Sequence, residues 1–253
     1  MYDVYKGYAV RMVMQKKDEP EVTLWERLER PASAPRTALT PQRIAAVAVR
    51  VADAEGIAAV TMRRLATELG VAPMAAYRHV SGKDDLLALM VDTVSAELES
   101  PAEVTGWRDV LRESAHATRA MTLRHRWMAE LPTPLHALTP NRFASAERQL
   151  AALDGHGLDV DVLMAVFRTV TAYVGGMVRS EVALGEYLRQ QEWQSPEEMR
   201  IGLAPQMQYL IGTGRYPTYR RYIQEATRKD DPAWEFETGL ECVLDGVAAR
   251  FGL

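Results

Sequence analysis

The side chains best suited to chemistry lie in one segment, TMRRLATELGVAPMAAYRHVSGK, which spans residues 61–83. Hydroxyl, guanidinium, imidazole and ammonium donors bind phosphate oxygens and the edges of bases. The donors of the segment are Thr61, Arg63, Arg64, Tyr77, Arg78, His79 and Lys83. Arg63 and Arg64 fall in the first turn of an expected helix, where the macrodipole disfavours cations, so a bound anion would stabilise them. The segment therefore predicts a phosphate-binding surface, with an ordinary solvated face as the alternative.

Spacing and punctuation predict that two short helices position these donors. Thr61 can cap a first helix, and Gly70 stands where a left-handed residue ends it. Pro73 suits the first turn of a second helix, whose body runs from Met74 to Val80. Two short helices with a four-residue joint are typical of the helix-turn-helix motif that binds DNA.

The flanking segments complete a three-helix domain. An amphipathic helix is expected over Thr40–Glu55 and a scaffold helix over Ser81–Leu98, where Ser81 and Asp84 have the spacing of a capping box. From Thr40 to Leu98 the chain resembles the N-terminal domain of the tetracycline-repressor (TetR) family. The resemblance rests on three runs: LAxxLGV at 65–71, AxYxHV at 75–80 and KxxLL at 83–87.

The resemblance implies an all-α homodimer that binds double-stranded operator DNA and responds to a small molecule, with repression as the expected mode. Ala72 stands where the family often has a Ser or Thr helix cap, and Ala76 where it has a larger apolar residue, so the second helix is expected to be less firmly held. Because Met74 and Ala75 offer only apolar contact, these residues do not reveal the operator sequence. The family's DNA contacts fall on Thr61, Met62, Arg63, Pro73, Met74, Ala75, Tyr77, Arg78, His79 and Lys83, the last as a phosphate-binding lysine.

Breaks in the helical pattern divide the chain into three parts. They are an N-terminal, partly flexible extension over residues 1–38, a DNA-binding domain over 39–99, and a helical ligand-binding and dimerisation domain over 100–253. The third part is expected to contain helices over 106–125, 126–131, 140–154, 160–191, 196–211, 218–227 and 232–251, without a convincing strand.

The extension itself predicts little regular structure. Residues 24–30 predict a short helix, whose Trp25 and Leu28 are candidates for docking on the body of the protein. Arg30 and Arg36 are candidates for an arm that reaches the minor groove of DNA. A disordered tail is the alternative for residues 1–20.

Composition limits the class of protein. Residues 1–90 hold 13 Lys and Arg against 11 Asp and Glu, whereas residues 91–253 hold 17 against 23, so only the first part suits DNA. The single cysteine, Cys242, lies among apolar residues, which predicts a buried and inert thiol. The longest uninterrupted apolar run, residues 86–91, is far shorter than the roughly 20 residues of a membrane helix. The sequence therefore predicts a cytoplasmic protein with no membrane partner.

Two expected helices carry wide apolar stripes that suggest a homodimer. The stripes consist of Val166, Val170, Tyr173, Val174 and Met177, and of Phe236, Leu240, Val243, Leu244, Val247 and Phe251. Gly175 and Gly176 would permit close helix approach. Paired helices from two subunits would then form a four-helix bundle, as in the resembled family. The alternative is that both stripes fill the core of one chain.

The second half offers candidates for a small-molecule pocket but no catalytic constellation. The candidates have polar tips or broad faces, and positions in the core are the alternative: His116, His125, Trp127, Phe143, Met164, Phe167, Arg168 and Thr171. No two of the five histidines have the helical spacing of zinc ligands, and no G-x-S-x-G elbow occurs, so we expect no metal, cofactor or enzymatic activity. A constitutive architectural DNA-binding protein and an enzyme with a helical N-terminal module are the competing hypotheses.

Overall fold

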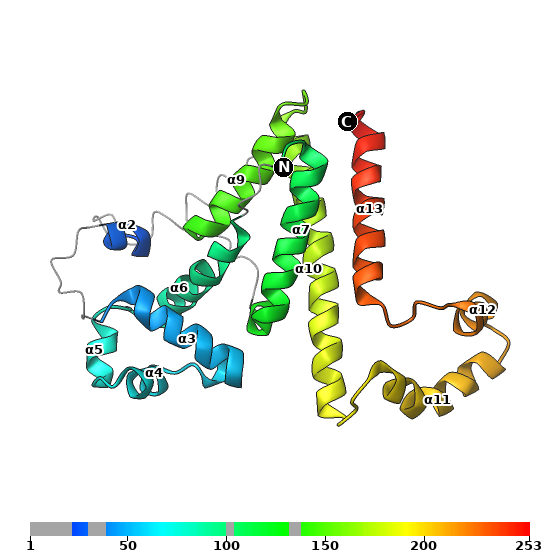
Figure 1. The fold of residues 1–253 in the computed structure, drawn as a ribbon, viewed down its shortest axis with the longest axis horizontal. Coiled ribbons are helices and arrows are strands. Elements are labelled where there is room, and N and C mark those ends of the chain that lie inside the picture. The colour runs from blue at the N-terminus through cyan, green and yellow to red at the C-terminus, as the bar shows by residue number, and fades with distance from the viewer. Residues whose placement is uncertain (1–21, 30–38, 100–103, 132–137) are drawn as a thin grey trace, which may run out of the picture. The chain divides into compact units, whose positions relative to one another are not determined.

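The computed structural model describes residues 22–29, 39–99, 104–131 and 138–253. Every regular element in these ranges is a helix, which confirms the all-α fold class (Figure 1). Helix α2 (Leu24–Glu29) belongs to a separate unit and begins with a capping box, in which Thr23 N–H donates to Glu26 (2.7 Å) and Glu26 N–H to the Thr23 hydroxyl (3.3 Å). The predicted docking of this helix stays a prediction, and the proposed arm residues Arg30 and Arg36 lie outside the described ranges.

Residues Leu39–Leu253 form the second compact unit, and its first helices make up what we call the reading head. The reading head contains α3 (Pro41–Glu55), the 3-10 turn η1 (Ile57–Ala59), α4 (Met62–Leu69), α5 (Pro73–Tyr77), α6 (Lys83–Ser95) and the 3-10 turn η2 (Ala96–Leu98). The Thr40 hydroxyl caps α3 by accepting from Arg43 N–H at 3.1 Å. Helix α3 packs on α6, and Ile44 and Met90 on these helices are fully buried.

Two helix boundaries in the reading head differ from the expectation. Helix α5 ends at Tyr77 and the chain continues as turns, so the helix does not extend to Val80. Helix α6 begins at Lys83, so Ser81 lies one residue too early to cap it, and the predicted capping box is wrong. Instead, the Asp85 carboxylate accepts a hydrogen bond from Ser81 N–H at 3.3 Å.

In the ranges that the structure describes, six α-helices and one 3-10 turn follow, and their starts agree with the sequence to within one residue. They are α7 (Trp107–Arg124), the 3-10 turn η3 (Arg126–Glu130), α9 (Pro140–Asp154), α10 (Val160–Gln190), α11 (Pro196–Gly212), α12 (Pro217–Glu225) and α13 (Pro232–Phe251). Four of them begin at proline, which has no N–H to leave unbonded and a φ suited to the first turn. Side-chain oxygens of Asp159, Ser195 and Asp231 cap α10, α11 and α13.

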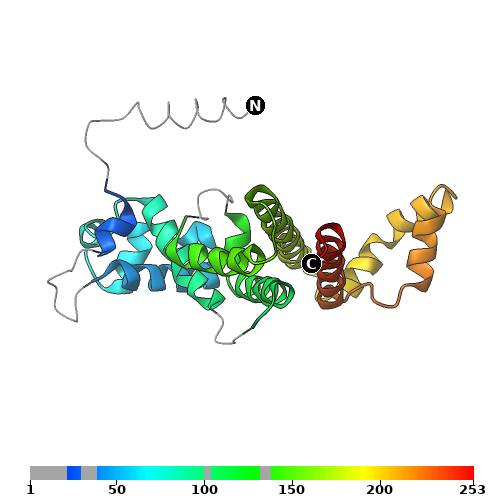
Figure 2. The ribbon, with the colours of Figure 1, turned by 90° about the horizontal axis from the view of Figure 1, so that it is seen from above.

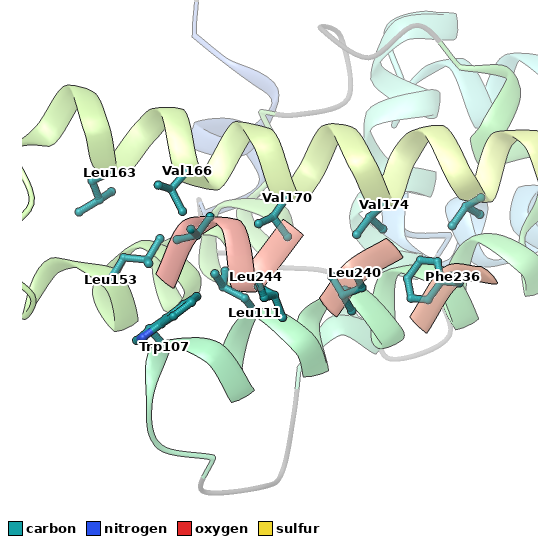
Figure 3. Packing of buried hydrophobic residues seen from close by; sticks show 13 residues of the cluster. Trp107, Leu111, Leu153, Leu163, Val166, Val170, Val174, Phe236, Leu240 and Leu244 are labelled. Carbon is teal, nitrogen blue, oxygen red and sulfur yellow. The ribbon is translucent and has the colours of Figure 1, made fainter. Parts of the chain in front are cut away.

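Helix α10 is the centre of the second core, where it packs on α7, α9 and α13. Figure 3 shows Val166, Val170 and Val174 of α10 lying against the side of α13 that carries Leu240 and Leu244. Both apolar stripes therefore fill the core of one chain, which is the alternative to the predicted dimer seam. Their outlying members differ: Tyr173, Met177 and Val243 are only partly buried, and Phe251 is exposed.

Charged side chains also join these helices. Arg108 and Arg112 of α7 both donate to Glu241 of α13, the latter through Nε at 2.8 Å. These hydrogen bonds lower the pKa of Glu241 from 4.5 to about 2, and the bond from Arg112 has a larger effect than the bond from Arg108. Arg119 of α7 binds Glu181 of α10 through two hydrogen bonds of 2.8 and 3.0 Å.

Two expectations about the second half need correction or qualification. Cys242 is exposed, because it lies on the side of α13 opposite Leu240 and Leu244, so the predicted buried thiol is wrong. Helix α10 is long and apolar enough to span a membrane by length and composition. The core helix of a soluble protein passes the same test, and α10 supplies five buried residues to the core, so the absence of a membrane partner stays a prediction.

Helices α11 and α12 contribute no buried residue to the fold. Figures 1 and 2 both show them lying beyond α10 and α13, away from the other helices of this unit. They carry several exposed aromatic side chains, including Tyr209, which is 76% exposed.

Candidate nucleic-acid interface

The two helices of the motif are fixed by local hydrogen bonds that the sequence predicts. The Thr61 hydroxyl caps α4 by accepting from Arg64 N–H at 3.2 Å. Gly70 ends α4 with φ +67°, a left-handed conformation that favours glycine. Val71 N–H then donates to the Ala66 carbonyl at 3.0 Å, which fixes the direction in which the chain leaves α4.

Tertiary packing holds α5, and of the two alanines that depart from the family pattern only Ala76 takes part in it, because Ala72 is exposed. Ala72 is the N-cap of α5. Its methyl side chain has no hydrogen-bond acceptor, so it forms no capping hydrogen bond. Its carbonyl accepts from Ala75 N–H at 2.9 Å. Ala76 and Val80 are fully buried and anchor the helix to the reading head. The small side chain at 76 therefore lies on the inner face of α5, opposite the surface available to a ligand.

The outer face of the motif presents the predicted donors to solvent. Met74 is 70% and Tyr77 48% exposed. Thr61, Arg63, Arg78, His79 and Lys83 are also exposed, whereas Met62 and Ala75 are half-buried and the side chain of Pro73 is not described. Among the residues that the structure describes, the side chains of Arg63, Arg78, His79 and Lys83 have no ion-pair partner. The positive charges of Arg63, Arg78 and Lys83 are therefore available to phosphates.

Arg64 does not belong to this set of available donors. Its guanidinium pairs with Glu55 at 2.8 Å and with Glu68 at 3.1 Å. The acidic residues of α3 and α4 therefore resolve the conflict with the helix macrodipole, and the expectation that Arg64 needs an external anion is wrong. Arg63, one residue earlier, points to solvent and keeps its predicted role.

The predicted pocket residues are not brought together in one place. His116 is exposed and pairs with Glu237 at 2.8 Å. Phe143 is 58% exposed on α9, and Arg168 and Thr171 are exposed on α10, while Met164 and Phe167 are half-buried there. A cavity of about 370 Å³ instead adjoins Arg200 and residues 226–231, none of which was expected from the sequence. The described residues contain no cluster of potential metal ligands.

His125 and Trp127 occupy a different kind of site, the junction between the reading head and the helices after it. His125 lies between carboxylates of Asp53 on α3 and Glu97 on η2. Trp127 is 1% exposed and donates its indole N–H to Asp53 at 2.8 Å. The sequence does not single out Asp53 or Glu97, because 72 and 28 residues separate them from His125 and no short-range pattern connects them.

A helix-turn-helix with an exposed cationic face, joined to a larger helical bundle, defines a DNA-binding regulator. Two family models match the chain: "Bacterial regulatory proteins, tetR family" over residues 44–90 and "Tetracyclin repressor-like, C-terminal domain" over residues 100–251. The chain belongs to the tetracycline-repressor (TetR) family. It is a DNA-binding transcriptional regulator and not an enzyme, which confirms the predicted function at the level of the family.

Individual relatives are similar to this protein over most of the chain. The HTH-type transcriptional repressor DrrR1 of Streptomyces coeruleorubidus is 33% identical over 88% of this chain and 83% of its own length. The TetR family protein ActR of Streptomyces coelicolor, solved in complex with actinorhodin, has a TM-score of 0.70 and 27% identity over 85% of this chain and 98% of ActR. BioQ, solved with its natural double-stranded DNA operator, has a TM-score of 0.50 and 30% identity over 59% of this chain and 90% of BioQ.

Proposed function

We propose that this chain is a homodimeric repressor that binds double-stranded operator DNA through α4 and α5 and leaves it when a small molecule binds the second half. The observation that carries the proposal is the positive charge of Arg63, Arg78 and Lys83, which are exposed and have no ion-pair partner among the described residues, beside a helix pair whose Leu65 and Ala76 are buried. Three similarities support this function: DrrR1 is a repressor, BioQ was solved with its DNA operator, and ActR was solved with the small molecule actinorhodin.

We assign different roles to the exposed side chains. Arg63, Tyr77 and Lys83 contact phosphates, because they are exposed and their donors suit phosphate oxygens. Met74 projects furthest from α5 and contacts base edges, for which a thymine methyl is the suitable apolar partner. Arg78 and His79 follow the last residue of α5 and contribute the remaining donors to the DNA surface.

The phosphate assignment is tested by the salt dependence of binding. Lys83→Ala removes one cation, so the slope of log K against log salt concentration should flatten by roughly one unit, for all DNA sequences alike. The matched control is Arg221→Ala, which removes an exposed cation from α12, outside the reading head. An unchanged slope for Lys83→Ala, or equal changes in both variants, would exclude Lys83 from the DNA contact.

The dimer uses the outer sides of α10 and α13 rather than the predicted stripes. Many of the exposed residues on these sides are small: Ala165, Thr169, Ala172, Ser180 and Ala183 on α10, and Thr238, Cys242, Gly246 and Ala249 on α13, beside the charged Arg179 and Asp245. Small side chains let helices approach closely, and the two helices already pack on each other. Four such helices from two chains would form the expected bundle.

Sedimentation of charged variants tests this assignment. Ala172→Glu places a carboxylate in the proposed interface and should shift the protein toward monomer, because an unpaired buried charge is unfavourable. Ala144→Glu is the control, since Ala144 is exposed on α9, outside the interface. A monomeric wild-type protein at micromolar concentration would contradict the dimer.

Release by an effector requires unequal affinities for two states of the protein. The effector must bind the DNA-free arrangement more tightly, and operator DNA must weaken effector binding by the same factor. A compound that raises the melting temperature identifies a ligand, and titration with and without operator duplex then tests coupling. Equal affinities for every such ligand would favour a constitutive architectural protein. We expect the regulator to act in the cytoplasm, with no membrane partner.

A further inference from the structure

A buried histidine joins the reading head to the helices that follow it. His125 is the residue between α7 and η3 and is 5% exposed. Its Nδ1 lies 2.8 Å from Asp53 Oδ1 near the end of α3, and its Nε2 lies 2.9 Å from Glu97 Oε1 on η2. The His125 side chain, at the end of α7, therefore contacts both α3 and η2 of the reading head.

The chemistry of these two contacts depends on a proton. An ionised carboxylate only accepts hydrogen bonds, whereas a neutral imidazole donates from one nitrogen and accepts at the other. With both carboxylates ionised, only the imidazolium can donate to Asp53 and Glu97 at the same time. Loss of its proton leaves one ring nitrogen facing a carboxylate oxygen, two acceptors with no hydrogen between them.

The neighbouring groups match an imidazolium in this position. The charged groups that face it are Asp53 from α3 and Glu97 from η2, and Arg124 of α7 binds the other oxygen of Glu97. Trp127 of η3 adds an uncharged donor to Asp53 Oδ1 at 2.8 Å. Each carboxylate thus accepts a second hydrogen bond besides the one at the imidazole, from Trp127 for Asp53 and from Arg124 for Glu97.

We propose that His125 is a positioning residue for operator binding, which as an imidazolium clamps the reading head to the second half. The clamp holds α3, which packs on α6 and thereby supports the recognition surface. A restrained reading head loses less conformational freedom when it binds DNA, so the protonated clamp favours operator binding. This inference rests on the proposed function.

The experiment measures operator affinity between about pH 5.5 and 8, the range in which histidine changes charge. All proteins carry His79→Gln, so that the exposed histidine of the DNA face does not contribute to the profile. With His125 intact, affinity should fall as pH rises, by about fivefold or more, a typical size for coupling between sites. His125→Gln should remove most of this pH dependence and bind as weakly as the high-pH form.

Two further variants separate positioning from general destabilisation. His156→Gln is the control, because His156 is exposed in the turn after α9, and it should keep the full pH profile. Asp53→Asn removes the negative charge of one of the two acceptors, so the imidazolium is less favoured over the neutral ring and the pH dependence should weaken. Circular dichroism at each pH confirms that every variant is folded during the titration.

The outcomes distinguish this inference from the proposed function. If the His79→Gln protein binds operator with the same affinity at every pH, or if His125→Gln keeps its pH dependence, the clamp is refuted. If His125→Gln lowers only the melting temperature and leaves affinity and profile unchanged, His125 is structural and the inference also fails. If the wild-type protein binds no operator at any pH, the proposed function itself fails.

Discussion

Replacing Glu241 by Gln removes the charge that joins α13 to α7 while it keeps the size of the side chain. Glu241 accepts hydrogen bonds from both Arg108 and Arg112, which hold its pKa at about 2 instead of 4.5. In Gln an NH2 group replaces one of the two carboxylate oxygens, and it cannot accept the hydrogen bond from the guanidinium that faces it. We therefore expect the variant to be less stable at pH 7.

The difference in pKa sets a ceiling on the effect. A change from 4.5 to about 2 corresponds to roughly 3 kcal/mol at pH 7 by linkage. The Glu241 side chain is 31% exposed, so solvent screening reduces this to about 1–2 kcal/mol. Asp245→Asn is the matched control: Asp245 also pairs with Arg108 but is 69% exposed, and its loss should cost about 0.5 kcal/mol or less.

Urea denaturation at one fixed protein concentration measures both variants, because the stability of the proposed dimer would depend on concentration. The pKa of Glu241 is lowered in the folded state, so its contribution is present above about pH 4.5 and is lost as pH falls toward 2. The difference between wild type and Glu241→Gln should shrink over that interval. Equal losses in the two variants, or a loss independent of pH, would refute the reasoning.

Four other substitutions test the packing of the second half. A Cβ at Gly239 would lie 2.3 Å from the Tyr173 hydroxyl, so Gly239→Ala should destabilise by about 1 kcal/mol or more, whereas Gly185→Ala, with open space around it, should stabilise by up to ~1 kcal/mol; similar melting temperatures for the two would contradict this contact. Arg142 is half-buried without an acidic partner among the described residues, and burial lowers its pKa, so Arg142→Met should raise stability by up to about 1 kcal/mol. A less stable variant would show that the guanidinium has a favourable contact. Leu244→Ala, in the core of one chain, should cost about 2–5 kcal/mol in urea unfolding, and a loss below 1 kcal/mol would place Leu244 outside that core.

Local chemistry made much of this fold readable from the sequence. Thr61 and Gly70 bound α4 because a hydroxyl cap and a left-handed glycine act within one turn of the chain. Pro140 and Pro232 begin α9 and α13 for an equally local reason, the fixed φ of proline. The exposure of Arg63 on α4 and of Tyr77 on α5 was predictable as well, since the side of a short helix on which a residue lies follows from spacing.

What lies opposite each helix face was decided only by the tertiary structure. The periodicity of Leu240 and Leu244 shows that one side of α13 is apolar, but a stripe has the same spacing whether it meets its own chain or a partner. Arg64 looks like a free donor until α3 brings Glu55 to it. His125 becomes a possible clamp only because the fold places Asp53 and Glu97 on either side of its ring. Such contacts join residues far apart in the chain, and neither propensity nor spacing encodes them.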